Sequence, residues 1–165
     1  MTRLFIAVWP PDEVLDAVEA LHRPVEGGGR WTRRDQWHVT LRFLGPAHVT
    51  EVTEALAGLH HERVEAVVGP EVGMLGEGVV QLPVAGLETL AGAVVALTGG
   101  LGRSPEDRPF FGHLTLARMA GEPPVGVLGQ AWAASFPVDR IALVDSTLGG
   151  NAARYTTVAT FPLSG

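Results

Sequence analysis

Residues 37–45 read Trp-His-Val-Thr-Leu-Arg-Phe-Leu-Gly, and residues 113–116 return to the same order as His-Leu-Thr-Leu. Each segment alternates polar and apolar residues, which is typical of a β-strand whose residues i and i+2 share one face. The pattern therefore predicts two strands, each with a histidine and a threonine on one face and its apolar residues in the core. If the strands face each other, two imidazoles and two hydroxyls meet, which is a set of groups suited to acid–base chemistry on a small anion.

The surrounding pattern predicts a single α+β domain over residues 1–165. Alternating or β-rich runs predict strands over residues 3–9, 37–44, 64–72, 79–84, 111–119, 138–148 and 154–162. Helical periodicity predicts helices over residues 12–22, 50–61 and 87–101, with Thr50 as an N-cap. Gly149, Gly150 and Asn151 are expected to form the turn between the last two strands. Because each half contains one motif strand, we expect two lobes of antiparallel sheet related by a pseudo-twofold axis, with outer helices and a central cleft.

Composition limits the classes of function. The chain of 165 residues carries a net charge of −6, which argues against a long non-specific nucleic-acid footprint but allows recognition of one phosphate at a chain end. All 12 basic residues are arginines, and there is no cysteine for a disulfide, a thiolate metal site or a nucleophile. The N-terminal apolar run is broken by Pro10 and Pro11 and does not resemble a secretory leader. We therefore expect a cytoplasmic protein with no membrane segment.

Longer segments around the motifs resemble a known family. They are Arg-Leu-Phe-Ile-Ala-Val at residues 3–8, the motif segment at 37–45, Arg-Pro-Phe-Phe-Gly-His-Leu-Thr-Leu-Ala-Arg at 108–118, and parts of the tail at 146–149, 153–156 and 161–163. In this order they are similar to the 2H phosphoesterase superfamily, in its bacterial RNA 2′,3′-cyclic phosphodiesterase or 2′-5′ RNA ligase branch. Gly112 departs from that branch, which often has proline before the second histidine.

The resemblance implies a bilobal fold and a reaction. The expected substrate is RNA with a 2′,3′-cyclic phosphate end, which is opened to a 2′-phosphomonoester and a free 3′-OH without a metal or nucleotide cofactor. A small nucleotide is an expected product, and a monomer is the expected state. The ligase reaction is the same chemistry run backwards and could accompany the hydrolysis.

The motif residues fit this reaction in named roles. Opening a cyclic phosphodiester needs a base for water and an acid for the departing oxygen, and histidine serves both near neutral pH. The resemblance implies that His38 is the acid and His113 the base, although the residues alone leave this polarity open. Thr40 and Thr115 are expected to donate hydrogen bonds to the non-bridging oxygens of the phosphate.

Two arginines are candidates for contact with the phosphate. Arg118 matches a phosphate-contacting arginine of the resembling family, but in a regular strand it would share the core face with Leu114 and Leu116. A strand end or a β-bulge near Ala117 is therefore required. Arg42 has the same parity as His38 and Thr40 and is a further candidate cation, although a solvated surface arginine is the simpler interpretation.

Other functions remain open. The same chemistry could act on 2′-5′ oligonucleotides or on small cyclic nucleotides, with loop residues choosing among them. A non-catalytic binder of phosphorylated RNA ends is an alternative, although arginine or lysine would serve a binder better than neutral imidazoles. No metal is expected, because His38 and His113 have no third ligand at a suitable spacing.

Overall fold

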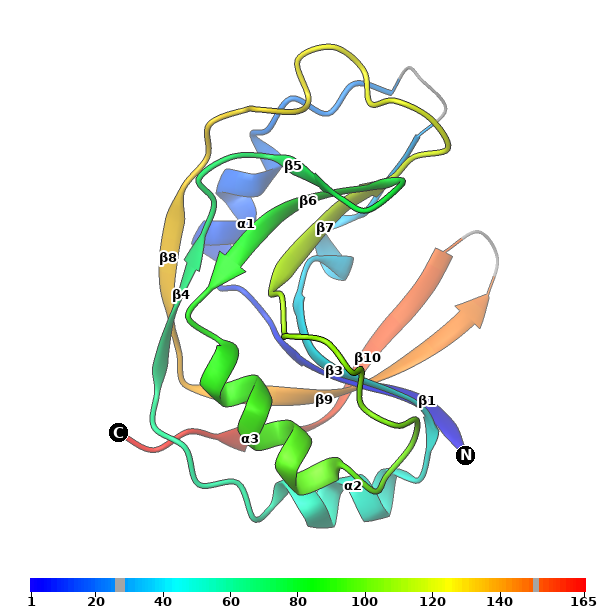
Figure 1. Cartoon of the computed structure of the whole chain (residues 1–165), viewed down its shortest axis with the longest axis vertical. Helices are drawn as coiled ribbons and strands as arrows, with labels where there is room; N and C mark the ends of the chain where they lie inside the picture. The colour runs from blue at the N-terminus through cyan, green and yellow to red at the C-terminus, as the bar shows by residue number, and fades with distance from the viewer. Residues whose placement is uncertain (26–28, 150–151) are drawn as a thin grey trace.

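One curled antiparallel sheet of ten strands dominates the computed structural model, which describes residues 1–25, 29–149 and 152–165. The strands are β1 (Thr2–Val8), β2 (Arg30–Trp31), β3 (Val39–Ala47), β4 (Val64–Val68), β5 (Gly73–Leu75), β6 (Val79–Ala85), β7 (His113–Arg118), β8 (Ala134–Val138), β9 (Arg140–Gly149) and β10 (Ala152–Pro162). The helices are α1 (Asp12–Glu19), α2 (Val49–Leu56) and α3 (Glu88–Thr98), with a short 3₁₀ turn η1 (Arg34–Gln36). Figure 1 shows how the sheet curls around the middle of the molecule.

Two similar halves make up the sheet. The order of its main path is β10-β9-β1-β3-β7-β6-β4-β8, with β2 beside β7 and β5 beside β6. We call β10-β9-β1-β3 the first lobe and β7-β6-β4-β8 the second lobe. Each lobe supplies its motif strand, β3 or β7, to the centre, where Val39 lies opposite Leu114. This arrangement confirms the expected α+β fold with one motif strand in each lobe.

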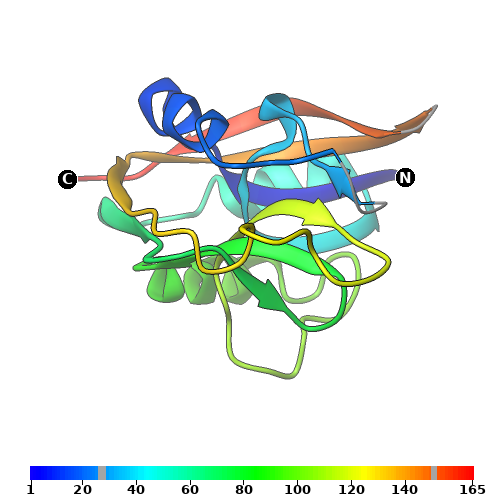
Figure 2. The same ribbon diagram turned by 90° about the horizontal axis from the view of Figure 1, so that it is seen from above.

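Helices cover the face of the sheet opposite the motif histidines. Leu4 and Ile6 point from β1 into the main core, and both are fully buried. The helix α3 packs against β3 and α2, and α2 and α3 lie close together in Figure 1. The indole Nε1 of Trp132 donates to the carbonyl of Ala17 at 3.1 Å and so holds α1 near the start of β8. Seen from above, the two chain ends lie on opposite sides of the molecule (Figure 2).

Element boundaries differ from the sequence predictions in ways that local chemistry explains. The first motif strand begins at Val39 and continues through Pro46, which is tolerated because only β1 pairs with β3 at that end. The helix α2 begins at Val49 after His48, so Thr50 lies in its first turn and does not cap it. The pattern missed the short strand β8. Gly150 and Asn151, part of the predicted turn, lie outside the described residues.

Candidate active site

The two motif strands meet at one point, and this contact decides how the site is assembled. Val39 and Leu114 form the cross-strand pair, and both side chains are fully buried. Antiparallel partners share a face, so extending this register by one residue in each direction places His38 opposite Thr115 and Thr40 opposite His113. All four side chains then lie on the face opposite the buried pair, which we call the reaction face.

The hydrogen bonds of His38 determine which of its ring nitrogens carries the proton. Nδ1 lies 2.7 Å from the carbonyl oxygen of Gln36, and Nε2 lies 2.9 Å from Oγ1 of Thr40. A carbonyl oxygen can only accept, so Nδ1 carries the hydrogen of the neutral ring. Nε2 is then the acceptor, and the Thr40 hydroxyl donates to it. His38 therefore presents a basic nitrogen to its own motif threonine.

Aromatic rings surround His38. Its ring centroid lies 4.8 Å from that of Phe5, 5.6 Å from Trp9 and 5.3 Å from Tyr155, and the last two contacts are edge-on. Burial lowers the pKa of His38 to about 4 from an ordinary value of 6.5. The hydrogen bond to the Gln36 carbonyl opposes this shift, whereas the nearby charge of His113 adds to it. His38 is thus neutral at neutral pH in the free protein.

His113 repeats the backbone contact of His38 in a more open setting. Its Nδ1 lies 3.1 Å from the carbonyl oxygen of Phe111, again two residues earlier in the chain. The Phe111 ring is stacked on the imidazole, with 6.1 Å between centroids, and about half of the Phe111 side chain is exposed. The same argument places the hydrogen of the neutral ring on Nδ1 and leaves Nε2 for a substrate.

A threonine outside the motifs ties the segment before β3 to the second motif strand. The hydroxyl of Thr32 lies 2.9 Å from the carbonyl oxygen of Thr115 and 2.8 Å from that of Leu116, and its backbone N–H also donates to Leu116. The indole Nε1 of the buried Trp37 donates to the same hydroxyl at 2.8 Å. Thr32 thereby fixes the approach to His38 against β7. Nothing in the sequence signalled this role, because Thr32 belongs to no repeated pattern.

Each motif strand contains a β-bulge directly after its threonine. In β3, Thr40 pairs with Ala7 and Arg42 with Ile6, so Leu41 is the extra residue. In β7, Thr115 pairs with Gln81 and Ala117 with Val80, so Leu116 is the extra residue. A bulge turns the following side chains to the opposite faces of the strand. The second bulge is the one that the parity of Arg118 required near Ala117.

The first bulge overturns both interpretations of Arg42. Its side chain lies on the core face, where it is 5% exposed. The guanidinium donates to the carbonyl oxygen and the hydroxyl of Thr98 at the end of α3, and to the carbonyls of Leu101 and Arg103. Arg42 is therefore a structural residue that satisfies carbonyls at a helix C-terminus, and it is neither a solvated arginine nor a cation of the reaction face.

The second bulge places Arg118 in register with the reaction face. Arg118 follows the bulge by two residues, so it shares a face with His113 and Thr115, and its side chain is exposed. Its cross-strand neighbours are Val79 on β6 and Arg30 on β2. The corresponding residue of the first motif strand is Phe43, which packs with Phe5 and Tyr155 on the reaction face.

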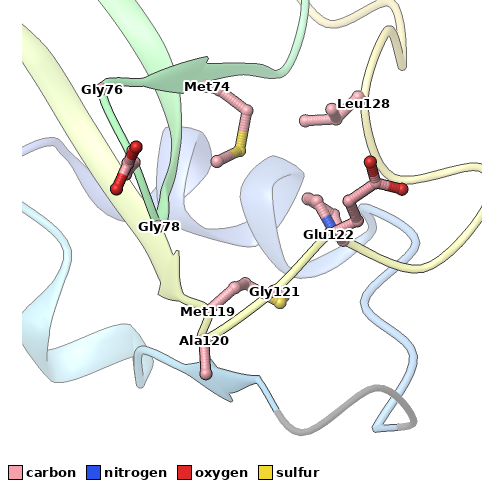
Figure 3. A pocket seen from close by; sticks show the side chains of 10 residues that line it. Met74, Gly76, Gly78, Met119, Ala120, Gly121, Glu122 and Leu128 are labelled. Carbon is pink, nitrogen blue, oxygen red and sulfur yellow. The ribbon is translucent and has the colours of Figure 1, made fainter.

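A cavity of about 930 Å³ lies beyond the C-terminal end of β7, away from the two histidines. Figure 3 shows Met74, Met119 and Leu128 around it, from the β5–β6 hairpin and the segment after β7. Glu77 and Glu122 are also in its lining, so its charge does not suit an RNA backbone. None of the predicted site residues lines it.

Neither a metal cluster nor a membrane helix is found in the described part of the chain. No three histidine, aspartate or glutamate side chains in residues 1–25, 29–149 and 152–165 are grouped as a metal ion would require. No helix within those ranges has the length and apolar character to cross a membrane.

Comparison with known sequences identifies similar proteins. A family model described as LigT-like phosphoesterase matches residues 8–69. The chain is 32% identical to the RNA 2′,3′-cyclic phosphodiesterase of Thermus thermophilus over 190 aligned residues, which cover 99% of this chain and 91% of the relative. It is 31% identical to the RNA 2′,3′-cyclic phosphodiesterase of Escherichia coli over 176 residues, covering 98% and 97% of the two chains.

Solved structures show the same fold over almost the whole length. A crystal structure of a Thermus thermophilus protein superposes with a TM-score of 0.83 at 30% identity, covering 99% of this chain and 98% of the other. Escherichia coli LigT in complex with 3′-AMP superposes with a TM-score of 0.82 at 27% identity, covering 99% of both chains.

Proposed function

Because the chain belongs to the LigT-like phosphoesterase family, we propose that it hydrolyses the 2′,3′-cyclic phosphate at the 3′ end of an RNA. The products are a 2′-phosphomonoester and a free 3′-OH. The observation that carries the proposal is the pair of histidines on adjacent strands, each with its Nδ1 against a carbonyl two residues earlier. This arrangement leaves both Nε2 atoms for one substrate.

The reaction needs one proton acceptor and one proton donor. In our proposal His113 Nε2 takes a proton from water, and the water oxygen forms a bond to phosphorus. The P–O3′ bond breaks, and His38 in its protonated form gives its proton to O3′. This is the order that the family resemblance implies. Burial lowers the pKa of His38 to about 4 in the protein without substrate, and a phosphate anion against the ring would favour its charged form.

Three further side chains would stabilise the negative charge that develops on the phosphate. Thr40 donates to His38 in the free protein, and its hydroxyl would turn to a non-bridging oxygen when the substrate binds. Thr115 occupies the matching place on β7, and Arg118 supplies a guanidinium from the end of that strand. The two imidazoles carry out both proton transfers, so the proposed reaction uses no metal or nucleotide cofactor.

The proposal also covers the partner, the oligomeric state and the cellular location. The partner is RNA with a cyclic phosphate end, the chain acts as a monomer, and it works in the cytoplasm as a single domain. Reverse 2′-5′ ligation would follow from the same groups. A small cyclic nucleotide is a second candidate substrate. The complex of the Escherichia coli relative with 3′-AMP fits a small nucleotide as a product.

The test is hydrolysis of an RNA oligonucleotide with a 2′,3′-cyclic phosphate end in the presence of EDTA, with the product isomer identified. The expected product is the 2′-phosphate. A 3′-phosphate product would contradict the proposed bond cleavage. No hydrolysis by folded protein would overturn the proposed function, and a small cyclic nucleotide assayed in parallel tests the second candidate.

A further inference from the structure

The side chain of Gln36 joins the turn η1 to the strand β10. Its Nε2 donates to the carbonyl oxygen of Ala153 at 3.0 Å, and its Oε1 accepts from the backbone N–H of Arg33 at 2.9 Å. The backbone carbonyl of the same residue accepts from Nδ1 of His38 at 2.7 Å. Gln36 therefore links two parts of the surroundings of one imidazole: the carbonyl that holds its Nδ1, and the strand that packs against its ring.

The strand β10 lies at the edge of the sheet, with β9 as its neighbour in the order of strands. An edge strand presents unpaired backbone groups on its outer side. One of them, the carbonyl of Ala153, accepts from the amide of η1 two residues before Tyr155, whose ring centroid is 5.3 Å from that of His38. Two residues after Tyr155, Thr157 accepts from the indole of Trp9, which also contacts the histidine. The strand is thus held on both sides of the ring that encloses His38.

The turn that carries Gln36 is fixed on its other side. Arg34, the first residue of η1, forms ion pairs with Asp16 at 2.6 Å and Glu19 at 3.3 Å on α1. In the described part of the chain, Gln36 is the member of η1 whose side chain forms a hydrogen bond with β10. Loss of this bond would leave the turn attached to α1 and release the edge strand. The enclosure of the first motif histidine therefore depends on Gln36.

We propose that Gln36 is a positioning residue for His38, which directs Nε2 at the leaving oxygen and keeps Tyr155 against the ring. An imidazole held only at Nδ1 can still rock about that bond, and the ring packed edge-on against it limits this motion. The titratable groups that face His38 are Tyr155 on β10 and His113 on β7, whereas the other two rings, from β1 and the residue after it, carry no charge. The effect on catalysis rests on the proposed function, whereas the effect on the imidazole itself does not.

The test replaces Gln36 with methionine, which has a similar length but neither donates nor accepts a strong hydrogen bond. Gln36→Met is expected to lower kcat for the cyclic-ended RNA by about 10- to 10²-fold, because small displacements of a catalytic group are costly. KM is expected to change less, since the residues proposed to bind the phosphate stay in place. As Tyr155 moves away, less burial should raise the pKa of His38 from about 4 towards 6.5, which NMR titration of the imidazole measures.

Combination with His38→Ala separates positioning from a general loss of structure. If Gln36 acts through the imidazole, Gln36→Met should lower turnover no further once that imidazole is removed. A further loss of the same size in the His38→Ala background would overturn the inference. Unchanged kcat, or an unchanged His38 pKa, in the folded Gln36→Met protein would also overturn it.

Gln130→Met is the matched control. The Gln130 side chain also joins two backbone segments: it accepts from the N–H of His22 at 2.9 Å and donates to the carbonyls of His22 at 3.0 Å and Val127 at 3.1 Å. This variant is expected to keep the native kcat and His38 pKa, and an equal loss in both variants would overturn the inference. If Gln36→Met does not fold, Gln36→Asn decides by the same measurements, since its amide is one methylene too short to keep both hydrogen bonds. No hydrolysis by the native protein would instead overturn the proposed function, and the NMR titration would still test the position of the ring.

Discussion

His38 and His113 occupy matching places in the two lobes, but their surroundings differ. Each imidazole is held by the carbonyl two residues before it. His38 is enclosed by Phe5, Trp9 and Tyr155, whereas Phe111 is the one aromatic ring that packs against His113 among the described residues. Enclosure lowers the pKa of His38 to about 4. The difference shows how a repeated motif obtains unlike surroundings: the motifs place the ring nitrogens, and the residues packed around His38 lower its pKa.

The positions after the two bulges differ in the same way. In the first lobe the core-facing residue is Arg42 and the outward one is Phe43, while in the second lobe they are Ala117 and Arg118. The first lobe therefore offers a ring that carries guanidiniums from elsewhere in the chain, and the second lobe offers a guanidinium of its own. This asymmetry suits a substrate that is asymmetric about its reacting phosphate.

Removal of either histidine is expected to have the largest effect on activity. His38→Ala and His113→Ala are each expected to reduce turnover of the cyclic phosphate by about 10²- to 10⁴-fold, because each removes one proton transfer. Hydrolysis rates of both variants, with circular dichroism to establish folding, measure this effect. His60→Ala is the matched control, as His60 is exposed and belongs to neither motif. A folded variant with near-native turnover would exclude the proposed role of that histidine.

Truncation of Arg118 tests the difference between Phe43 and Arg118, the outward residues that follow the two bulges. Arg118→Ala is expected to lower kcat/KM by on the order of 10²-fold, because it removes a guanidinium from the developing negative charge. Arg118→Lys should recover part of the loss, since it restores the charge without the planar fork. The measurement is steady-state kinetics on the cyclic-ended RNA. Equal activities for the native protein and Arg118→Ala would show that Arg118 does not contact the phosphate.

Removal of one of the aromatic rings around His38 is expected to have the smallest effect of these changes. Tyr155→Ala exposes His38, and less burial should raise its pKa from about 4 towards 6.5. With the higher pKa, the ring of the variant stays protonated to higher pH than the ring of the native protein. NMR titration of the imidazole in both proteins measures this shift. An equal pKa in the two proteins would show that the Tyr155 ring does not contribute to the burial that lowers it.

The sequence predicted the parts of the site and much of the fold because both rest on short patterns. Alternation around His38 and His113 was sufficient to identify two strands with the histidine and threonine on one face. A strand end or bulge near Ala117 was also predicted, because the family resemblance places Arg118 at the phosphate and a regular strand would turn it to the core; the structure has a bulge there. Boundaries were less certain, and α2 begins at Val49 without the predicted cap at Thr50. The sequence alone does not show whether a threonine side chain will reach the free N–H groups at the start of a helix.

The position of Arg42 could not be predicted from the sequence pattern. Its parity placed it beside His38, but an unforeseen bulge at Leu41 turned it into the core, where it meets carbonyls from residues 98–103. Thr32 and Tyr155 were missed for a related reason. Thr32 meets β7, and Tyr155 meets His38, only after strands distant in the sequence pair. No local period encodes such contacts.

Residue types and a spacing of two were enough to predict the candidate reacting groups, the strands that carry them and the family of the chain. The folded structure was needed to show which histidine is enclosed, which arginine lies on the reaction face and which is buried in the core. These properties depend on burial and on the pairing of distant strands. A pKa or a face of a strand is set by what packs against it, and that is known only once the chain has folded.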